Sequence, residues 1–182
     1  MTILRAIVRC FVAAWPTPAV VDALARLPRP SQDGLRWSGP EQWHITLRFF
    51  GEIAHAEVGA ATRALELAVL ELPGTLAAQG GPGTRFLGPG LVIWPVEGLA
   101  AAALAVERAS AGIGAPPRER PFFGHITLAR GRRGADLRKA RHLLCPLTES
   151  WPVGSLTLVQ SELHTDGARY RVLEDIPLAG AG

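Results

Sequence analysis

The sequence predicts an α+β fold of two similar lobes, each with a mostly antiparallel sheet and outer helices, around a central cleft. Segments with the character of strands and helices alternate along the chain. The tetrapeptide His-Ile-Thr-Leu occurs twice, and its copies begin 81 positions apart in a chain of 182 residues. A duplicated unit explains this spacing, so we expect one bilobal domain over residues 1–182, with lobes over roughly 1–85 and 86–182.

Composition places the chain among globular proteins. Hydrophobic residues make up 48% and charged residues 19%, which argues against disorder over most of the length. Apolar runs fall short of the ~18 residues that a membrane span needs, and Arg5 and Arg9 interrupt any secretion signal. Two cysteines are too few for a disulfide framework. We therefore expect a cytoplasmic protein without membrane association.

The formal net charge of +3 comes with basic residues that are almost all arginine, since Lys139 is the only lysine. A guanidinium suits bidentate phosphate contacts, although a GC-rich genome also explains such a composition. The charge permits RNA binding and does not establish it.

Strand and helix patterns alternate in the first half of the chain. β-branched and aromatic residues over 3–14 predict a strand, and the segment 16–18, Pro-Thr-Pro, opens a short helix with apolar residues at helical spacing. Turn residues over 31–40 predict a loop. Strict alternation over 43–50 predicts the clearest strand, and an Ala/Leu/Glu-rich segment over 56–72 predicts a helix.

A similar order recurs after a turn-dense middle that is rich in glycine and proline. The second half is expected to contain, in order, a strand over 91–96, a helix over 99–111, a strand over 122–129, a helix over 137–144 and a closing hairpin of 155–163 and 168–176 around Thr165-Asp166-Gly167. Each half thus contains a strand that carries a histidine and a helix that follows it.

The first His-Ile-Thr-Leu copy lies on a predicted strand, whose side chains alternate between two faces. Regular alternation assigns His44, Thr46 and Arg48 to one face and Ile45, Leu47 and Phe49 to the other. Because Arg48 lies farther along the strand than the other two polar residues, we expect it to meet solvent.

The second copy repeats the pattern with His125 and Thr127 on one face. Arg130 falls on the opposite face if this strand is regular, so only a bend could direct its side chain into the cleft. Two such strands across a cleft would surround a phosphate group with two imidazoles and two hydroxyls.

These residue types suit the opening of a cyclic phosphodiester. The reaction needs a base to deprotonate water and an acid to protonate the leaving ribose oxygen, and imidazole can serve as either near neutral pH. Threonine hydroxyls can donate hydrogen bonds to the nonbridging oxygens. A strained, singly charged ester does not require a metal, so we expect catalysis by His44 and His125 without a metal or another cofactor. A solvent-facing polar strand is the alternative for a single copy, and the repetition argues against it.

The chain resembles the 2H phosphoesterase superfamily, which is named for its two His-x-Thr/Ser motifs. Within it, the chain is similar to the bacterial and archaeal RNA 2′,3′-cyclic phosphodiesterases, also called 2′-5′ RNA ligases. The segments that carry the likeness are Arg9–Ala13, Trp43–Glu52, Pro121–Arg130, Val159–Leu163 and Gly167–Tyr170. Two departures are Phe123-Gly124, where relatives commonly have Arg-Pro, and the eight residues that precede Arg9.

The resemblance implies a bilobal fold with both histidines at a central cleft. It implies hydrolysis of the 2′,3′-cyclic end of RNA, including that of tRNA fragments, to a 2′-phosphate. His44 would donate a proton to the leaving 3′ oxygen and His125 would accept one from water, with exchanged roles in a reverse, ligase-like reaction. Substrate would be bound by Thr46, Thr127 and Arg130, and the protein would be a monomer.

The sequence also admits other interpretations. Phe11 could stack on the terminal base, with core packing as the favoured alternative. The same site could act on small cyclic nucleotides or 2′-5′ oligonucleotides, and a module that binds RNA ends without catalysis is a candidate of another class. His142 and Cys145 have half of a zinc spacing, but no second pair completes it, so no metal site is expected.

Overall fold

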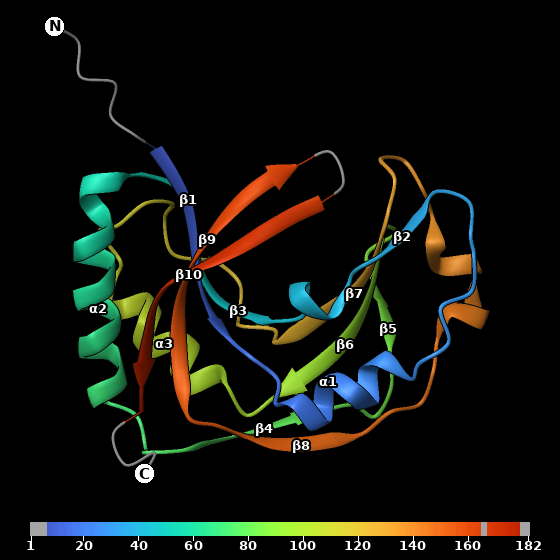
Figure 1. The fold of residues 1–182 in the computed structure, drawn as a ribbon, viewed down its shortest axis with the longest axis horizontal. Helices are drawn as coiled ribbons and strands as arrows, with labels where there is room; N and C mark the ends of the chain where they lie inside the picture. The colour runs from blue at the N-terminus through green and yellow to red at the C-terminus, as the bar shows by residue number, and fades with distance from the viewer. Residues whose placement is uncertain (1–6, 165–166, 179–182) are drawn as a thin grey trace, which may run out of the picture.

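The computed structural model describes residues 7–164 and 167–178, which form a curled, largely antiparallel sheet with helices around it (Figure 1). The strands are β1 Ile7–Ala14, β2 Leu35–Trp37, β3 Ile45–Ala54, β4 Leu76–Gly80, β5 Arg85–Leu87, β6 Leu91–Glu97, β7 His125–Gly131, β8 Glu149–Val153, β9 Ser155–His164 and β10 Gly167–Pro177. The helices are α1 Pro18–Ala25, α2 Val58–Leu70 and α3 Ala100–Ala109, with the 3-10 turns η1 Pro40–Gln42, η2 His55–Glu57, η3 Leu137–Lys139 and η4 Arg141–Leu143.

The strand order is symmetric about the junction of β3 and β7. The sheet runs β10-β9-β1-β3-β7-β6-β4-β8, while β2 also pairs with β7 and β5 with β6. At the junction, Ile45 lies opposite Ile126 in an antiparallel pair. These two residues are 81 positions apart, like the two histidines, so a local twofold axis passes between them. The predicted α+β class and the duplicated arrangement of the two histidine strands are therefore confirmed.

The halves of the chain are interleaved in the sheet. Strand β2, from the first half of the chain, pairs with β7, whereas β9 and β10, from the second half, join β1. The boundary near residue 85 therefore does not divide the sheet into its two sides. Pairing between distant strands decides this arrangement, and no local pattern in the sequence records it.

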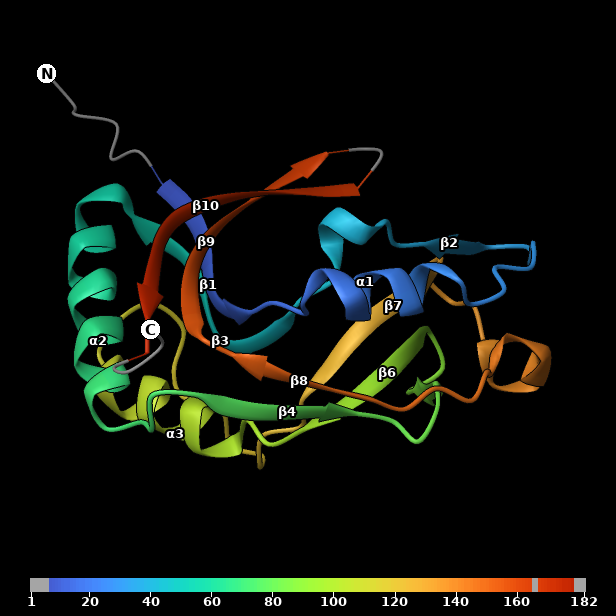
Figure 2. The ribbon, with the colours of Figure 1, turned by 60° about the horizontal axis from the view of Figure 1, so that its bottom comes forward.

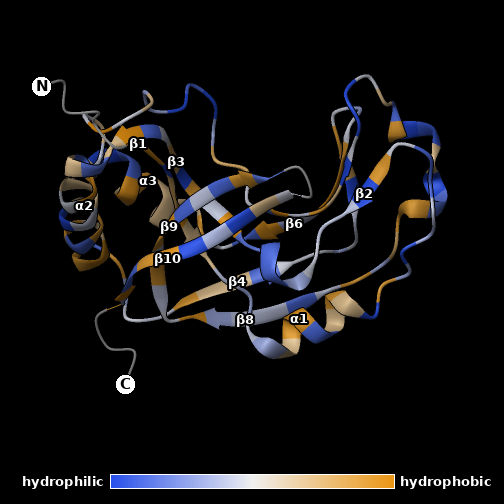
Figure 3. Cartoon of the chain, turned by 45° about the horizontal axis from the view of Figure 1, so that its top comes forward, coloured by the Kyte–Doolittle hydropathy of each residue, from blue (hydrophilic) through white to orange (hydrophobic). Residues whose placement is uncertain are grey.

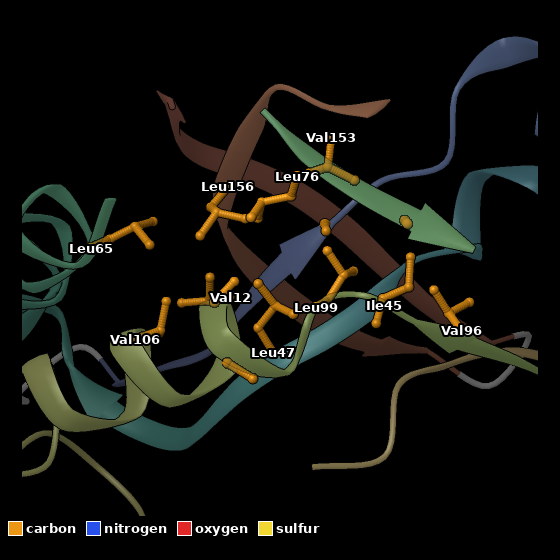
Figure 4. Close-up of a cluster of buried hydrophobic side chains, with 14 of the residues drawn as sticks. Val12, Ile45, Leu47, Leu65, Leu76, Val96, Leu99, Val106, Val153 and Leu156 are labelled. Carbon is orange, nitrogen blue, oxygen red and sulfur yellow. The ribbon is translucent and has the colours of Figure 1, made fainter. Parts of the chain in front are cut away.

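Helices cover one side of the sheet. Helices α2 and α3 pack on each other. Helix α3 also packs on β3 and α2 on the β9–β10 hairpin, whereas α1 lies beside β8 (Figure 2). A continuous apolar core lies between the helices and the sheet (Figure 4). Its strand residues include Val12, Ile45 and Leu47, which are at most 2% exposed. The core thereby fixes the backbones that carry the first His-Ile-Thr-Leu copy.

Most predicted elements are present, with one clear error in the second half. The predicted helix over 137–144 is wrong, because η3 and η4 are separate single turns. Ala140, which lies between them, has φ −87° and ψ 59°, outside the helical region. Leu137 and Leu143 are both buried in a small apolar cluster, so side-chain packing on β6 and β7 determines this path rather than helix propensity.

Two predicted boundaries also differ. The strand expected over 122–129 begins only at His125. Gly124, just before it, lies so close to the Val96 carbonyl oxygen that a Cβ atom would collide with it. Residues 3–6 of the first predicted strand lie outside the described residues, as do Thr165 and Asp166 of the closing turn.

Candidate active site

A β-bulge in β3 reverses the faces that regular alternation predicts. Thr46 pairs with Ala13 and Arg48 with Val12, which leaves Leu47 as an extra residue on β3. Beyond it, Arg48 turns into the interior and is 2% exposed, whereas Phe49 is 39% exposed and opens into the cleft. The predictions that Arg48 meets solvent and that Phe49 shares a face with Ile45 are therefore wrong.

The equivalent bulge in β7 brings Arg130 into the cleft. Thr127 pairs with Ile93 and Ala129 with Val92, so Leu128 is the extra residue. Arg130 then lies on the same side as His125 and Thr127 and lines the same cavity. Arg130 could reach the cleft only if the strand departed from regular alternation, and the bulge is that departure. Leu47 and Leu128 are 81 positions apart, so the duplication extends to the backbone irregularity.

The four motif side chains line one cavity of about 580 Å³, called the cleft below. Strands β3 and β7 form its floor, and β1, the η1 turn and the β9–β10 hairpin surround it; Figure 3 shows hydrophilic residues along β9 and β10. The cleft is lined by His44, Thr46, His125 and Thr127 together with Arg9, Phe11, Arg36, Ser38, Gln42, Phe49, Arg130, Ser161, Leu163, His164, Gly167, Ala168 and Tyr170. The structure thus brings every site residue expected from the sequence to one place.

The two histidines are oriented in the same way. Nδ1 of His44 lies 2.8 Å from the Gln42 carbonyl oxygen, and Nδ1 of His125 lies 2.9 Å from that of Phe123. A carbonyl can only accept, so each Nδ1 carries the proton and each neutral ring has an unprotonated Nε2. Nε2 of His44 lies 3.1 Å from Oγ1 of Thr46. Nε2 is therefore the nitrogen that each histidine can use for proton transfer.

Aromatic side chains enclose His44. The ring centroids of Phe11, Tyr170 and Trp15 lie 4.7, 4.9 and 5.7 Å from that of His44. The Trp15 indole donates a 3.1 Å hydrogen bond to Thr157, and the Thr157 hydroxyl lies 3.0 Å from Asp175. At 3% exposure, Phe11 has almost no open face for a nucleobase, which favours its packing role.

Burial changes the protonation of His44. Removal from water lowers its pKa to about 4, against the opposing effect of the Gln42 hydrogen bond, and the positive charges of Arg130 and His125 add to the lowering. His44 is therefore a neutral imidazole at neutral pH.

This lowered pKa predicts a pH-dependent loss of stability that His44→Asn removes. Below pH 6.5 an unfolded His44 takes up a proton, whereas the folded one stays neutral down to about pH 4. The free energy of unfolding should fall as pH drops through this window, by at most about 3 kcal/mol from this group. Denaturant titrations from pH 4 to 8 should give free energies of unfolding whose plots against pH are parallel for wild type and His44→Asn above pH 7. Below pH 6.5 the wild-type curve should fall relative to that of the variant. Curves that stay parallel to pH 4 would contradict the inference.

Several cleft residues escaped the sequence-based prediction. Tyr170 reaches His44 because β10 joins β9 and β9 joins β1, and the second of these pairings joins residues about 150 positions apart, such as Cys10 and Gln160. Trp15 reaches His44 because it follows Ala14, which pairs with Ile45 on β3. Arg9 and Arg36 reach the cleft from β1 and β2. A local pattern cannot reveal such neighbours; only the likeness of the segment Gly167–Tyr170 to a family hairpin pointed to that part of the chain.

Two further features concern the described residues alone. Nowhere in them do three or more His, Cys, Asp or Glu side chains gather as a metal ion would require. Their helices are also all too short or too polar to cross a membrane.

Comparison with known proteins finds relatives of this chain. A family model described as LigT-like phosphoesterase matches residues 15–77. An RNA 2′,3′-cyclic phosphodiesterase of Aeropyrum pernix is 32% identical over 78% of this chain and 85% of its own length. The protein of that name from Thermus thermophilus is 32% identical over 89% of this chain and 84% of its own length.

Solved structures show the same fold. A crystal structure of a Thermus thermophilus protein matches with a TM-score of 0.78 and 28% identity, covering 94% of this chain and 98% of that one. The Escherichia coli LigT structure with 3′-AMP matches with a TM-score of 0.72 at 22% identity, covering 96% and 99% of the two chains. The second likeness concerns the fold alone.

Proposed function

This chain belongs to the LigT-like phosphoesterases of the 2H superfamily, and on that premise we propose that it hydrolyses 2′,3′-cyclic phosphate ends of RNA to 2′-phosphates. Its relatives named RNA 2′,3′-cyclic phosphodiesterase support the substrate class. The observation that carries the proposal is the pair of histidines on twofold-related strands, each with Nδ1 bound to a carbonyl and Nε2 available.

In the proposed reaction, His125 acts as the base and His44 as the acid. Nε2 of His125 takes a proton from a water molecule, whose oxygen forms a new bond to phosphorus. The bond between phosphorus and the 3′ oxygen breaks, and protonated His44 gives its Nε2 proton to that oxygen. The products are a 2′-phosphate and a 3′-hydroxyl. In-line attack requires acid and base on opposite sides of phosphorus, which two strands related by a twofold axis supply.

The substrate itself supports the acid role of His44. Burial keeps the ring neutral at neutral pH, but an anionic phosphate nearby favours the imidazolium form. The Thr46 hydroxyl, 3.1 Å from Nε2, can then accept a hydrogen bond from the protonated ring and hold it toward the phosphate. Thr127 and Arg130 line the opposite side and are suited to stabilise the nonbridging oxygens.

The identity of the product tests this assignment directly. Purified protein incubated with an RNA bearing a 2′,3′-cyclic end should yield the 2′-phosphate, and chromatography against the 2′- and 3′-phosphate standards would measure it. The rate should be unchanged in excess EDTA, because the proposed steps use only side chains. A 3′-phosphate product would reverse the roles of the histidines, and loss of activity in EDTA with rescue by a divalent ion would overturn the two-histidine mechanism.

The proposal extends to reversible 2′-5′ ligation, in which a 5′-hydroxyl attacks phosphorus in place of water and the 3′ oxygen leaves as before. In the return reaction the 3′-hydroxyl attacks, the bond between phosphorus and the 5′ oxygen breaks, and the histidines exchange roles. Cyclic phosphates of single nucleotides and 2′-5′ oligonucleotides are the alternative substrates, and relative kcat/KM values on these and on longer RNA ends would rank them. A module that only binds RNA ends is disfavoured because both histidines and both threonines are in place. A monomeric state and a cytoplasmic location stay predictions.

A further inference from the structure

The second histidine, His125, is held by the residue two positions before it. The Phe123 carbonyl accepts the hydrogen bond from Nδ1 of His125, at 2.9 Å. The Phe123 ring also lies beside the imidazole, with ring centroids 5.8 Å apart and planes inclined by 27°. Stacked aromatic rings favour centroid distances of about 4.5–7 Å. One residue thus contacts His125 through both its backbone and its side chain.

The two contacts restrict different motions of the imidazole. The hydrogen bond to the carbonyl keeps the proton on Nδ1 and leaves Nε2 for proton transfer. This bond alone allows the imidazole to tilt about the line that joins Nδ1 to the carbonyl oxygen, whereas a stacked ring blocks the tilt on one face. The orientation of Nε2 in the cleft therefore depends on the Phe123 ring.

The backbone around Phe123 is fixed to the neighbouring strand β6. The Gly124 carbonyl accepts a 2.9 Å hydrogen bond from the amide of Val96. His125 pairs with Pro95 on the same strand. A Cβ atom at position 124 would collide with the Val96 carbonyl oxygen, so glycine is what allows this close approach. The backbone that carries the Phe123 ring to His125 is thus anchored on β6.

Arg85 contacts the same aromatic ring from a third strand, β5. Its guanidinium carbon lies 6.0 Å from the centre of the Phe123 ring. Arg85 pairs with Ile93 on β6, and Ile93 pairs with Thr127 on β7, so this arginine lies on the row of the sheet that carries the motif threonine. A guanidinium at this distance is attracted to an aromatic face and helps to hold the ring beside His125.

Neither the core nor the cleft accounts for Phe123. Its side chain is 45% exposed and lies outside the apolar clusters that the described residues form. It is also absent from the described residues that line the cleft, which include His125. The position of this large apolar side chain is therefore best explained by its contact with the imidazole.

We propose that Phe123 is a positioning residue for His125, which it holds in the orientation that the base requires. The inference rests on the proposed function and adds to it how the base is prepared. When Nε2 takes a proton from water, the imidazole gains a positive charge, and the face of an aromatic ring attracts a cation at such a distance. The Phe123 ring thus orients the neutral base and stabilises the charge that the base acquires in the transition state.

Kinetics of two variants test the positioning role. Phe123→Leu keeps an apolar side chain and the carbonyl but removes the ring, so kcat for an RNA with a 2′,3′-cyclic end should fall by about tenfold. KM should change little, because Phe123 does not line the cleft. Phe123→Tyr retains the ring and should retain the wild-type kcat. Leu104→Ala, at an exposed position on α3 outside the cleft, should alter neither constant. An unchanged kcat in Phe123→Leu, or an equal loss in Phe123→Tyr, would overturn the proposal.

A spectroscopic measurement separates this inference from the proposed function. The ring current of Phe123 shifts the carbon-bound protons of a stacked imidazole, and proton–carbon correlation spectra of the histidine rings detect this shift without turnover. The His125 signals, assigned by their loss in His125→Asn, should move in Phe123→Leu, whereas those of His44 should stay. His125 signals that do not move would overturn the proposal. If they move but the wild type hydrolyses no cyclic phosphate, the proposed function fails and the positioning of His125 by Phe123 stands.

Discussion

His44→Ala and His125→Ala are each expected to lower the rate of cyclic phosphate hydrolysis by at least about 10²- to 10⁴-fold, because a positioned general acid or base contributes about that much. In the proposed mechanism, the two imidazoles act on the same transition state, one at each end of the in-line displacement. Removal of either imidazole leaves the reaction with an acid but no base, or with a base but no acid. The double variant should therefore be scarcely slower than either single variant. Rates with an RNA bearing a 2′,3′-cyclic end would measure all three.

Matched variants separate catalysis from folding. Thr46→Ala and Thr127→Ala should cost less than either histidine variant, because each removes one hydrogen bond and leaves the pair of imidazoles in place. The histidine variants should unfold cooperatively and retain the far-ultraviolet circular dichroism of the wild type, since both side chains lie at the cleft rather than in the core. Hydrolysis near the wild-type rate by either single histidine variant would refute the assignment of that residue.

The sequence predicts which strands carry the site residues, but it does not predict which face of the strand the residues after each bulge occupy. The repeated tetrapeptide identified both strands and four side chains that meet in the cleft. Regular alternation fails after the first four residues of each copy, because a bulge at Leu47 and another at Leu128 shift the following residues to the other face. Both leucines are buried, and a buried apolar residue fits a regular strand equally well. The identity of a bulged residue is decided by its partner strand, which the sequence of the bulged strand does not contain.

The enclosure of His44 illustrates a second kind of information that local patterns lack. Its low pKa comes from burial among residues of β1 and β10 and from the loop after β1. Periodicity places each of these residues on its own element, but the distance between His44 and Tyr170 depends on a chain of strand pairings, β10 on β9 and β9 on β1. Electrostatic properties of the site are therefore a consequence of topology.

Arg48, which follows the bulge of β3 and points into the interior, binds the loop that follows α3. Its guanidinium donates hydrogen bonds to the carbonyl oxygens of Ile113, Ala115 and Pro116, at 3.3, 2.5 and 3.0 Å, and lies 3.8 Å from Glu107. Arg118, from the same loop, also pairs with Glu107 and donates to the carbonyl of Leu47. The loop that leads from α3 toward the second histidine is thus fastened to the bulge that follows the first.

Arg48→Met is expected to lower the free energy of unfolding by about 3 kcal/mol or more, because it removes the donor to three part-buried carbonyl oxygens and one of the two arginines that pair with the Glu107 carboxylate. Arg108→Met is the matched control. The Arg108–Glu71 pair is closer, at 2.7 Å, but its side chains are 63% and 57% exposed, against 3% for Arg48. An exposed ion pair contributes about 0–1 kcal/mol, so denaturant titrations should show a small change for Arg108→Met and a large one for Arg48→Met. Similar small changes in both variants would show that the guanidinium of Arg48 does not hold the loop on β3.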